Sequence, residues 1–240
     1  MSPLLIPIAI EWVILVTTLA PIVLVGRFDA RPKLGLTLWF GSLLSSGLAA
    51  AIALAVAFSS IFSTYAKLLE TPFGSTDWQS TLAVSFAPWL ILAISGVALA
   101  LINQRLEPLI IVARESKPLI DAAAKPWMTF EGHEVCTIEV PIFLAATARG
   151  RILISKIAAE ALDELELQAV LWHEVGHIRG RHNALKQLAS LVRLLSPWLT
   201  VSRALVPEVD RLVEIDADVY ALRHVDPELL TSTRRRFLIS

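Results

Sequence analysis

Three long apolar stretches dominate the start of the chain, at about residues 4–25, 36–58 and 82–102. A helix needs about 20 apolar residues to cross the hydrocarbon core of a bilayer, and each stretch is long enough. The first stretch lacks the basic start and the small-residue cleavage pattern of a signal peptide, so we expect it to be retained. The pattern therefore predicts a membrane domain with three transmembrane helices at residues 1–105.

Short β-like runs replace the long apolar stretches after about residue 108. The predicted strands cover residues 127–130, 135–140 and 151–155. Turn signals at Glu131-Gly132 and Arg149-Gly150 separate these runs. The pattern favours a small sheet that packs on the helix that follows it. An equally supported interpretation makes the last run an edge strand that pairs with an extended peptide substrate.

The next predicted helix carries the pattern H-E-x-x-H. It begins after Asp163, which forms a capping box with Glu166, and Gly180 is a plausible end. His173 and His177 are four residues apart and therefore lie on one face of this helix. Apolar residues flank the polar stripe on both sides, which favours a largely buried helix over a surface helix with two solvated histidines.

H-E-x-x-H on a helix predicts a hydrolytic zinc site. The imidazoles of His173 and His177 would converge on one ion, and Glu174 would face the water that the ion holds. Zinc lowers the pKa of such a water to about 7, so that a neighbouring carboxylate can take its proton. Glu174 is therefore the predicted catalytic base.

A third zinc ligand is predicted on a later helix, at about residues 207–225, which opens at Pro207. Glu214 and Asp218 are four residues apart and share a face, whereas Asp216 is rotated away from both. Glu214 would bind the metal, and Asp218 would accept the second N–H of a ligand imidazole. The alternative is an acidic, solvated helix face without a metal.

The segment between the two ligand helices, at about residues 185–206, is apolar enough to suggest another span. A single crossing would put Glu214 on the opposite side of the membrane from His173 and His177. We therefore expect helices that lie on the bilayer surface or re-enter it. The tail, at residues 226–236, reads as a short helix that ends in a solvated or lipid-contacting basic cluster.

Composition agrees with a membrane protein. Hydrophobic residues make up 55% of the 240-residue chain and charged residues 18%, and the mean hydropathy is +0.63. A net charge of −1 without a basic, aromatic-rich patch argues against a nucleic-acid partner. The single cysteine, Cys136, excludes an internal disulfide.

Charge in the loops predicts the orientation in the membrane. Arg27, Arg31 and Lys33 make the first loop basic, whereas the second loop, at about residues 67–77, is not. Because basic loops face the cytoplasm, we expect a multi-pass protein of the cell membrane whose N-terminus lies outside. Residues 106–240 would then form a cytoplasmic domain.

Residues 164–182, with the sequence ELELQAVLWHEVGHIRGRH, and residues 213–218, VEIDAD, resemble the membrane zinc metallopeptidases. Two groups share these motifs: the HtpX and CAAX prenyl protease group, with H-E-x-G-H and E-x-x-A-D, and the BlaR/MecR group. The resemblance covers about residues 151–222. It implies a zincin-like α+β domain of the gluzincin type.

Position by position, the resemblance implies that His173, His177 and Glu214 bind Zn²⁺. It also implies that Glu174 is the base and that Asp218 accepts a hydrogen bond from a ligand imidazole. The three spans and the cytoplasmic zinc domain are similar to the BlaR/MecR layout.

These observations predict a zinc endopeptidase at the cytoplasmic face of a membrane, acting in regulatory proteolysis of the BlaR/MecR type. Its partners would be the lipid membrane and a protein or peptide substrate, such as a cytoplasmic repressor. His182 and His224 are candidates for the group that stabilises the oxyanion. One alternative is an HtpX-like protease for membrane protein quality control. Another is a non-catalytic signalling or scaffold protein with a structural zinc site.

Overall fold

The computed structural model describes residues 5–70, 101, 104, 122–197 and 199–238. The chain divides into two compact units. One comprises residues 1–23 and 38–109, and the other comprises residues 24–37 and 110–240.

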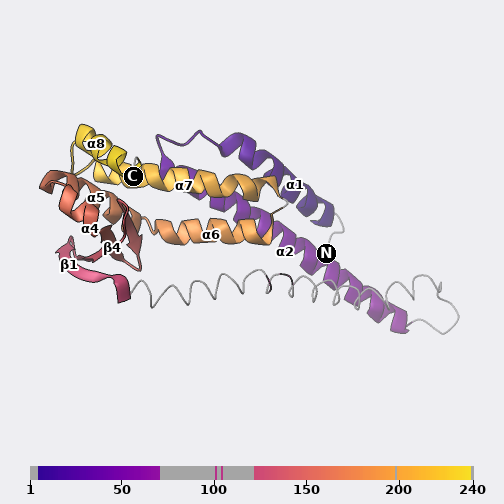
Figure 1. The fold of residues 1–240 in the computed structure, drawn as a ribbon. Coiled ribbons are helices and arrows are strands. Elements are labelled where there is room, and N and C mark those ends of the chain that lie inside the picture. Colours follow the sequence, from indigo (N-terminus) through magenta and orange to yellow (C-terminus); the bar gives the residue numbers. More distant parts are fainter. Residues whose placement is uncertain (1–4, 71–100, 102–103, 105–121, 198, 239–240) are drawn as a thin grey trace. The chain divides into compact units, whose positions relative to one another are not determined.

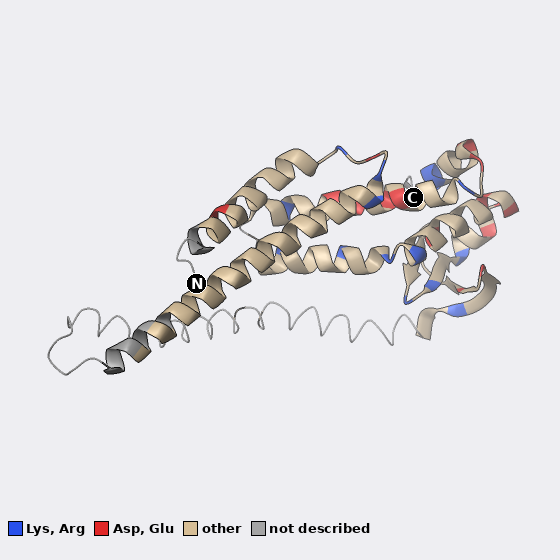
Figure 2. Ribbon diagram, turned by 180° about the vertical axis from the view of Figure 1, so that it is seen from behind, with Lys and Arg blue, Asp and Glu red and all other residues tan. Residues whose placement is uncertain are grey.

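The described part of the first unit consists largely of two helices (Figure 1). They are α1, Leu5–Leu24, and most of α2, Pro32–Glu70. The segment Pro32–Ser60 of α2 is, among the described residues, the one helix long and apolar enough to cross a membrane. The apolar part of α1 is shorter, and charged residues are sparse along both helices (Figure 2). The predicted helices at residues 4–25 and 36–58 are therefore confirmed as helices, while the predicted span at residues 82–102 lies almost entirely outside the described residues.

The second unit contains a four-stranded mixed sheet. Its strands are β1 (Lys125–Phe130), β2 (His133–Ile138), β3 (Ala145–Ala148) and β4 (Arg151–Ser155), in the order β1-β2-β4-β3. β2 and β4 run parallel, and the other neighbouring pairs are antiparallel. The three predicted strands are confirmed. Glu131-Gly132 and Arg149-Gly150 form the predicted turns, since all four residues have positive φ.

The sequence-based interpretation of residues 151–155 as an edge strand is wrong. β4 lies inside the sheet, between β2 and β3, and the open edge near the helices belongs to β3. Sequence reasoning missed β3 because Ala-Ala-Thr-Ala has little β propensity and no clear alternation of apolar and polar residues. Its pairing with β4 across the short turn supplies what the local sequence lacks.

Helix α5, Glu164–Arg179, packs on this sheet after the short helix α4, Lys156–Ala161. The predicted capping box is present: Asp163 accepts from the backbone N–H of Glu166, and Glu166 accepts from that of Asp163. Fully buried side chains of the sheet and the helix form the core between them. They include Val135, Ile152, Ile154 and Val175. The sheet therefore fixes α5, as the sequence predicted.

Three further helices complete the unit: α6 (His182–Leu195), α7 (Thr200–Ala221) and α8 (Pro227–Leu238). The predicted helix start at Pro207 is wrong, because α7 already begins at Thr200 and contains Pro207. Val201 and Leu205 are fully buried, so packing stabilises the turns that precede the proline. The local proline signal is thus overridden by tertiary contacts.

The segment at residues 185–206 is not one continuous helix. It forms the end of α6, a turn and the start of α7. α6 and α7 run antiparallel, because Lys186 near the start of α6 contacts Glu214 late in α7. This reversal brings Glu214 back beside α5. Residues 185–206 therefore do not separate the two ligand helices, and their predicted place on or within the bilayer surface stays a prediction.

Residues 24–37, between α1 and α2, pack against α7. The backbone N–H of Gly26 donates to Oε1 of Glu208 at 3.1 Å, and Arg211 joins Glu208 to Asp29. A Cβ atom at Gly35 would lie 3.0 Å from the side chain of Leu212, so the approach is close. These contacts fix α7 on the side that carries Glu208 and Leu212.

Candidate metal centre and active site

Helices α5 and α7 meet at two small residues. A Cβ atom at Gly176 would lie 3.0 Å from the Cα atom of Ala217 and 3.1 Å from its carbonyl oxygen. Ala217 is fully buried, so no larger side chain separates the two backbones. The close approach places Glu214 of α7 opposite His173 and His177 of α5.

Three potential ligand atoms converge at this point. Nε2 of His173 lies 3.0 Å from Nε2 of His177 and 3.4 Å from Oε2 of Glu214. Nε2 of His177 lies 3.5 Å from Oε1 of Glu214. In a tetrahedral zinc site with bonds of about 2.0–2.1 Å, neighbouring ligand atoms are about 3.3 Å apart. The spacing of the three side chains therefore fits a zinc ion with a further position open to water or substrate.

The outer nitrogen atoms of both rings are already engaged. Nδ1 of His173 lies 2.8 Å from Oδ1 of Asp218, and Nδ1 of His177 lies 2.9 Å from Nδ1 of His182. If the Nδ1 atoms carry the protons, both Nε2 lone pairs point at the same space. Two lone pairs beside a carboxylate repel each other unless a cation lies between them. This donor set of two imidazoles and one carboxylate suits zinc.

The pKa values of His173 and Glu214 also indicate that the carboxylates of the site favour a positive charge beside them. Burial alone would lower the pKa of His173, but hydrogen bonds with Asp218 and Glu214 raise it to about 9. Burial opposes ionisation of Glu214, yet hydrogen bonds from His173 and His177 hold the pKa of Glu214 well below its usual range. Glu214 is therefore an anion that can serve as a ligand.

Glu174 lies next to the donor cluster and lines the same cleft. Its side chain is buried, and this burial raises its pKa, which the neighbouring His173 and His177 partly oppose. A carboxyl group with a raised pKa is a stronger base than an ordinary carboxylate and is suited to accept a proton from water. The structure thus brings Glu174 together with the three candidate ligands.

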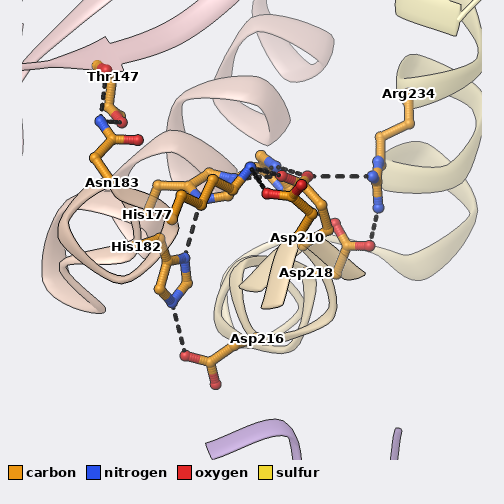
Figure 3. Close-up of polar contacts among 11 residues, drawn as sticks. Thr147, His177, His182, Asn183, Asp210, Asp216, Asp218 and Arg234 are labelled. Carbon is orange, nitrogen blue, oxygen red and sulfur yellow. Dashed lines mark hydrogen bonds and ion pairs between the residues drawn. The ribbon is translucent and has the colours of Figure 1, made fainter. Parts of the chain in front are cut away.

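Two cations surround the carboxylates. Nζ of Lys186 lies 3.1 Å from Oε1 of Glu214, and Arg234 of α8 contacts Glu214 and Asp218 (Figure 3). Arg236 also has a partner, since its guanidinium lies 2.5 Å from Oε2 of Glu166. Arg234 and Arg236 therefore make ion pairs within the protein, which the expectation of a merely solvated or lipid-contacting basic tail did not include. Sequence spacing could not reveal these pairs, because they join residues distant in the chain.

A cleft of about 290 Å³ opens above the donor cluster. Its walls come from β3 and from helices α5 to α8. They include Ala145, Ala146, Thr147, Val170, Asn183, Leu230, Thr233 and Phe237. One wall is thus the backbone of an edge strand, and another is largely apolar.

The alternation along β3 identifies the backbone groups that face this cleft. The carbonyl of Leu144 accepts from the N–H of Ser155 in β4, so every second residue of β3 pairs inward. Thr147 has the opposite orientation, because Nδ2 of Asn183 donates to its carbonyl at 2.7 Å. Ala145 has the same orientation as Thr147. Its N–H and carbonyl therefore point towards the cleft.

His182 and His224 do not lie where a substrate contact requires them. His182 is fully buried behind His177 and contacts Asp216 on its other side (Figure 3). The ring of His224 stacks on Trp172, with ring centroids 3.5 Å apart. Neither residue is part of the cleft lining. The described contacts therefore give no support to their suggested role in oxyanion stabilisation, and Lys186 and Arg234 are the cationic side chains that line this cleft among the described residues.

The site thus combines two histidines and a glutamate on one helix, an acidic residue on a second helix, and an edge strand beside them, which is the set of groups that a metallopeptidase uses. In a comparison with protein families, residues 143–208 match the model of peptidase family M48. The match supports a metallopeptidase of the M48 type, and hence a hydrolase. It includes His173, Glu174 and His177 and ends before Glu214. A comparison with curated proteins found no match.

We predict that Glu214→Ala removes the metal. The wild-type protein, purified in detergent without chelators, should hold about one zinc ion per chain, since three protein ligands define one site. Elemental analysis should show a sharp fall in zinc for Glu214→Ala because only the two imidazoles remain. Glu160→Ala is a matched control, since Glu160 is exposed and contacts only Lys156 among the described pairs. Full zinc content in Glu214→Ala would exclude Glu214 as a ligand.

Proposed function

We propose that the protein is a membrane-bound zinc endopeptidase that hydrolyses peptide bonds of a protein substrate. The observation that carries this proposal is the spacing of 3.0–3.5 Å among the donor atoms of His173, His177 and Glu214, with Glu174 beside them in an open cleft. A structural zinc site has four protein ligands, whereas a hydrolytic site keeps one position free. Three ligands and an adjacent glutamate favour catalysis over a purely structural zinc site.

Each polar side chain then has a definite task. Bound zinc would polarise the substrate carbonyl and lower the pKa of water. Glu174 accepts a proton from the attacking water and passes it to the leaving amine. Asp218 accepts a hydrogen bond from the Nδ1–H of His173 and so holds this ring in place. Lys186 and Arg234 supply positive charge at the cleft where the oxyanion develops.

The substrate would bind as an extended strand along β3. Ala145 presents an N–H and a carbonyl to the cleft, and an edge strand pairs readily with a peptide through such groups. The carbonyl of Thr147 is already occupied by Asn183, which limits this pairing to the part of β3 near Ala145. Folded proteins lack free extended segments, so the proposed substrates are loops, termini or unfolded regions.

Glu174→Gln should abolish hydrolysis while leaving zinc in place. Loss of a general base typically costs about 100- to 10,000-fold in rate. The assay follows casein cleavage by the detergent-purified protein and identifies new N-termini by mass spectrometry. Glu160→Gln makes the same chemical change at an exposed position of α4 and should retain full activity.

Equal activity of Glu174→Gln and wild type would refute the assignment of Glu174 as base. A zinc-loaded wild type that cleaves nothing, with a cellular phenotype that Glu174→Gln preserves and His177→Ala abolishes, would instead support the non-catalytic scaffold.

Methylation of substrate backbone nitrogens should reveal pairing with β3. For a casein-derived peptide that wild type cleaves, N-methylation should weaken kcat/KM at alternate positions near the scissile bond. A lost backbone hydrogen bond costs about 0.5–1.5 kcal/mol, and alternate residues of a strand face opposite ways. The unaffected alternate positions serve as internal controls. Uniform effects at consecutive positions would contradict strand pairing.

We further propose that the catalytic unit faces the cytoplasm and that the N-terminus lies outside. The basic residues Arg27, Arg31 and Lys33 support this orientation. The proposed role is regulatory proteolysis of the BlaR/MecR type, with a cytoplasmic repressor as substrate. Comparing proteomes of cells that carry wild type or Glu174→Gln tests this role: one stabilised protein agrees with it, whereas many stabilised unfolded proteins would favour an HtpX-like quality-control role.

A further inference from the structure

A chain of hydrogen bonds leads from His177 away from the cleft. Nδ1 of His182 lies 2.9 Å from Nδ1 of His177, and Nε2 of His182 lies 3.2 Å from Oδ2 of Asp216 (Figure 3). His182, at the start of α6, thus lies between His177 of α5 and Asp216 of α7. Helical spacing rotates Asp216 away from Glu214 and Asp218. Its side chain is the last member of this chain of hydrogen bonds.

The two contacts allow one consistent assignment of protons. When Nε2 of His177 faces the donor cluster, its Nδ1 carries the proton and donates to Nδ1 of His182. The proton of His182 is then on Nε2, which donates to the carboxylate of Asp216. Every ring nitrogen has one role, and no proton is shared. The chain therefore fixes both the tautomer and the rotation of the His177 ring.

Burial makes this chain hard to replace by water. His182 is fully buried and Asp216 is 7% exposed. A buried imidazole or carboxylate without a partner is costly, so each residue depends on the other. Lys33 also approaches Asp216, but its Nζ lies 4.0 Å away and its side chain is 76% exposed. That exposed ion pair contributes little, and His182 is the close described partner of Asp216.

The turn between α5 and α6 is shaped to hold the His182 ring. A Cβ atom at Gly180 would lie 2.0 Å from Nε2 of His182, so the ring occupies the space beside this glycine. Arg181, the next residue, has φ of 51°, which is an uncommon backbone conformation for arginine. Arg181 is therefore strained, and Gly180 has no room for a side chain. In this conformation the turn places His182 beneath His177.

We propose that His182 and Asp216 are positioning residues that hold the imidazole of His177 with Nε2 towards the metal position. They serve His177 as Asp218 serves His173. The inference rests on the proposed zinc site and extends it. α7 then contributes three acidic residues to the centre: Glu214 as ligand, and Asp216 and Asp218 as supports for the two histidines from opposite sides.

Zinc affinity of the full-length protein in detergent, measured by competition with a chromophoric chelator, tests this proposal. Loss of a group behind a metal ligand typically weakens binding by about 10- to 100-fold. We expect such a loss for His182→Ala and for Asp216→Asn. His182→Asn should recover part of it, because the amide oxygen can accept from His177 without reaching Asp216. Glu160→Gln, which removes a carboxylate charge at an exposed position of α4, is the control and should bind zinc as wild type does.

Gly180→Ala provides a second test that leaves every polar group in place. Its added methyl group must displace the His182 ring, so zinc affinity should fall and the visible spectrum of the cobalt(II)-substituted protein should change. Gly41→Ala is the matched control, since a Cβ atom there meets nothing within 4 Å. A role in stability alone would lower the unfolding temperature without altering the cobalt spectrum.

The outcomes separate this inference from the proposed function. Unchanged zinc affinity and cobalt spectrum in folded Asp216→Asn and Gly180→Ala would overturn the positioning role while the zinc site stands. Absence of zinc binding in wild type would overturn the zinc site and this inference together. Weaker binding in His182→Ala, with partial recovery in His182→Asn and unchanged binding in Glu160→Gln, is the result we expect.

Discussion

The close contact between α5 and α7 is the constraint on which the candidate metal centre depends. Gly176 allows the backbone of α5 to come within van der Waals distance of Ala217. Only this approach places a glutamate of α7 within 3.5 Å of the two histidines of α5. The spacing H-E-x-G-H and E-x-x-A-D thus has a packing reason as well as a chemical one: the small residues set the distance that the ligands need.

The elements around this contact hold it from all sides. The sheet packs on α5 through a buried apolar core. α6 runs along α7 and supplies Lys186 to Glu214, and α8 supplies Arg234. Residues 24–37 fix the side of α7 that carries Glu208 and Leu212. Asp216 and Asp218 pair with imidazoles, and Glu214 also contacts Lys186, so these three carboxylates of α7 have the partners that burial requires.

Local sequence signals predicted much of this arrangement. The capping box before α5, the four-residue spacings and the turns at Gly132 and Gly150 each act within a few residues, and the structure has them. The features that sequence reasoning missed depend on contacts between distant residues. β3 exists through pairing with β4, the first turns of α7 are stabilised by the burial of Val201 and Leu205, and His182 faces Asp216 on another helix. The position of His182 behind His177, outside the cleft lining, could not be predicted for the same reason.

In the proposed site, His173, His177 and Glu214 together bind one zinc ion. X-ray absorption at the zinc edge of the purified, membrane-extracted protein tests this binding directly, because the method reports the atoms bound to the metal. We expect a first shell of nitrogen and oxygen at about 2.0–2.1 Å with the scattering pattern of two imidazoles. A sulfur shell near 2.3 Å, or a shell without two imidazoles, would contradict it.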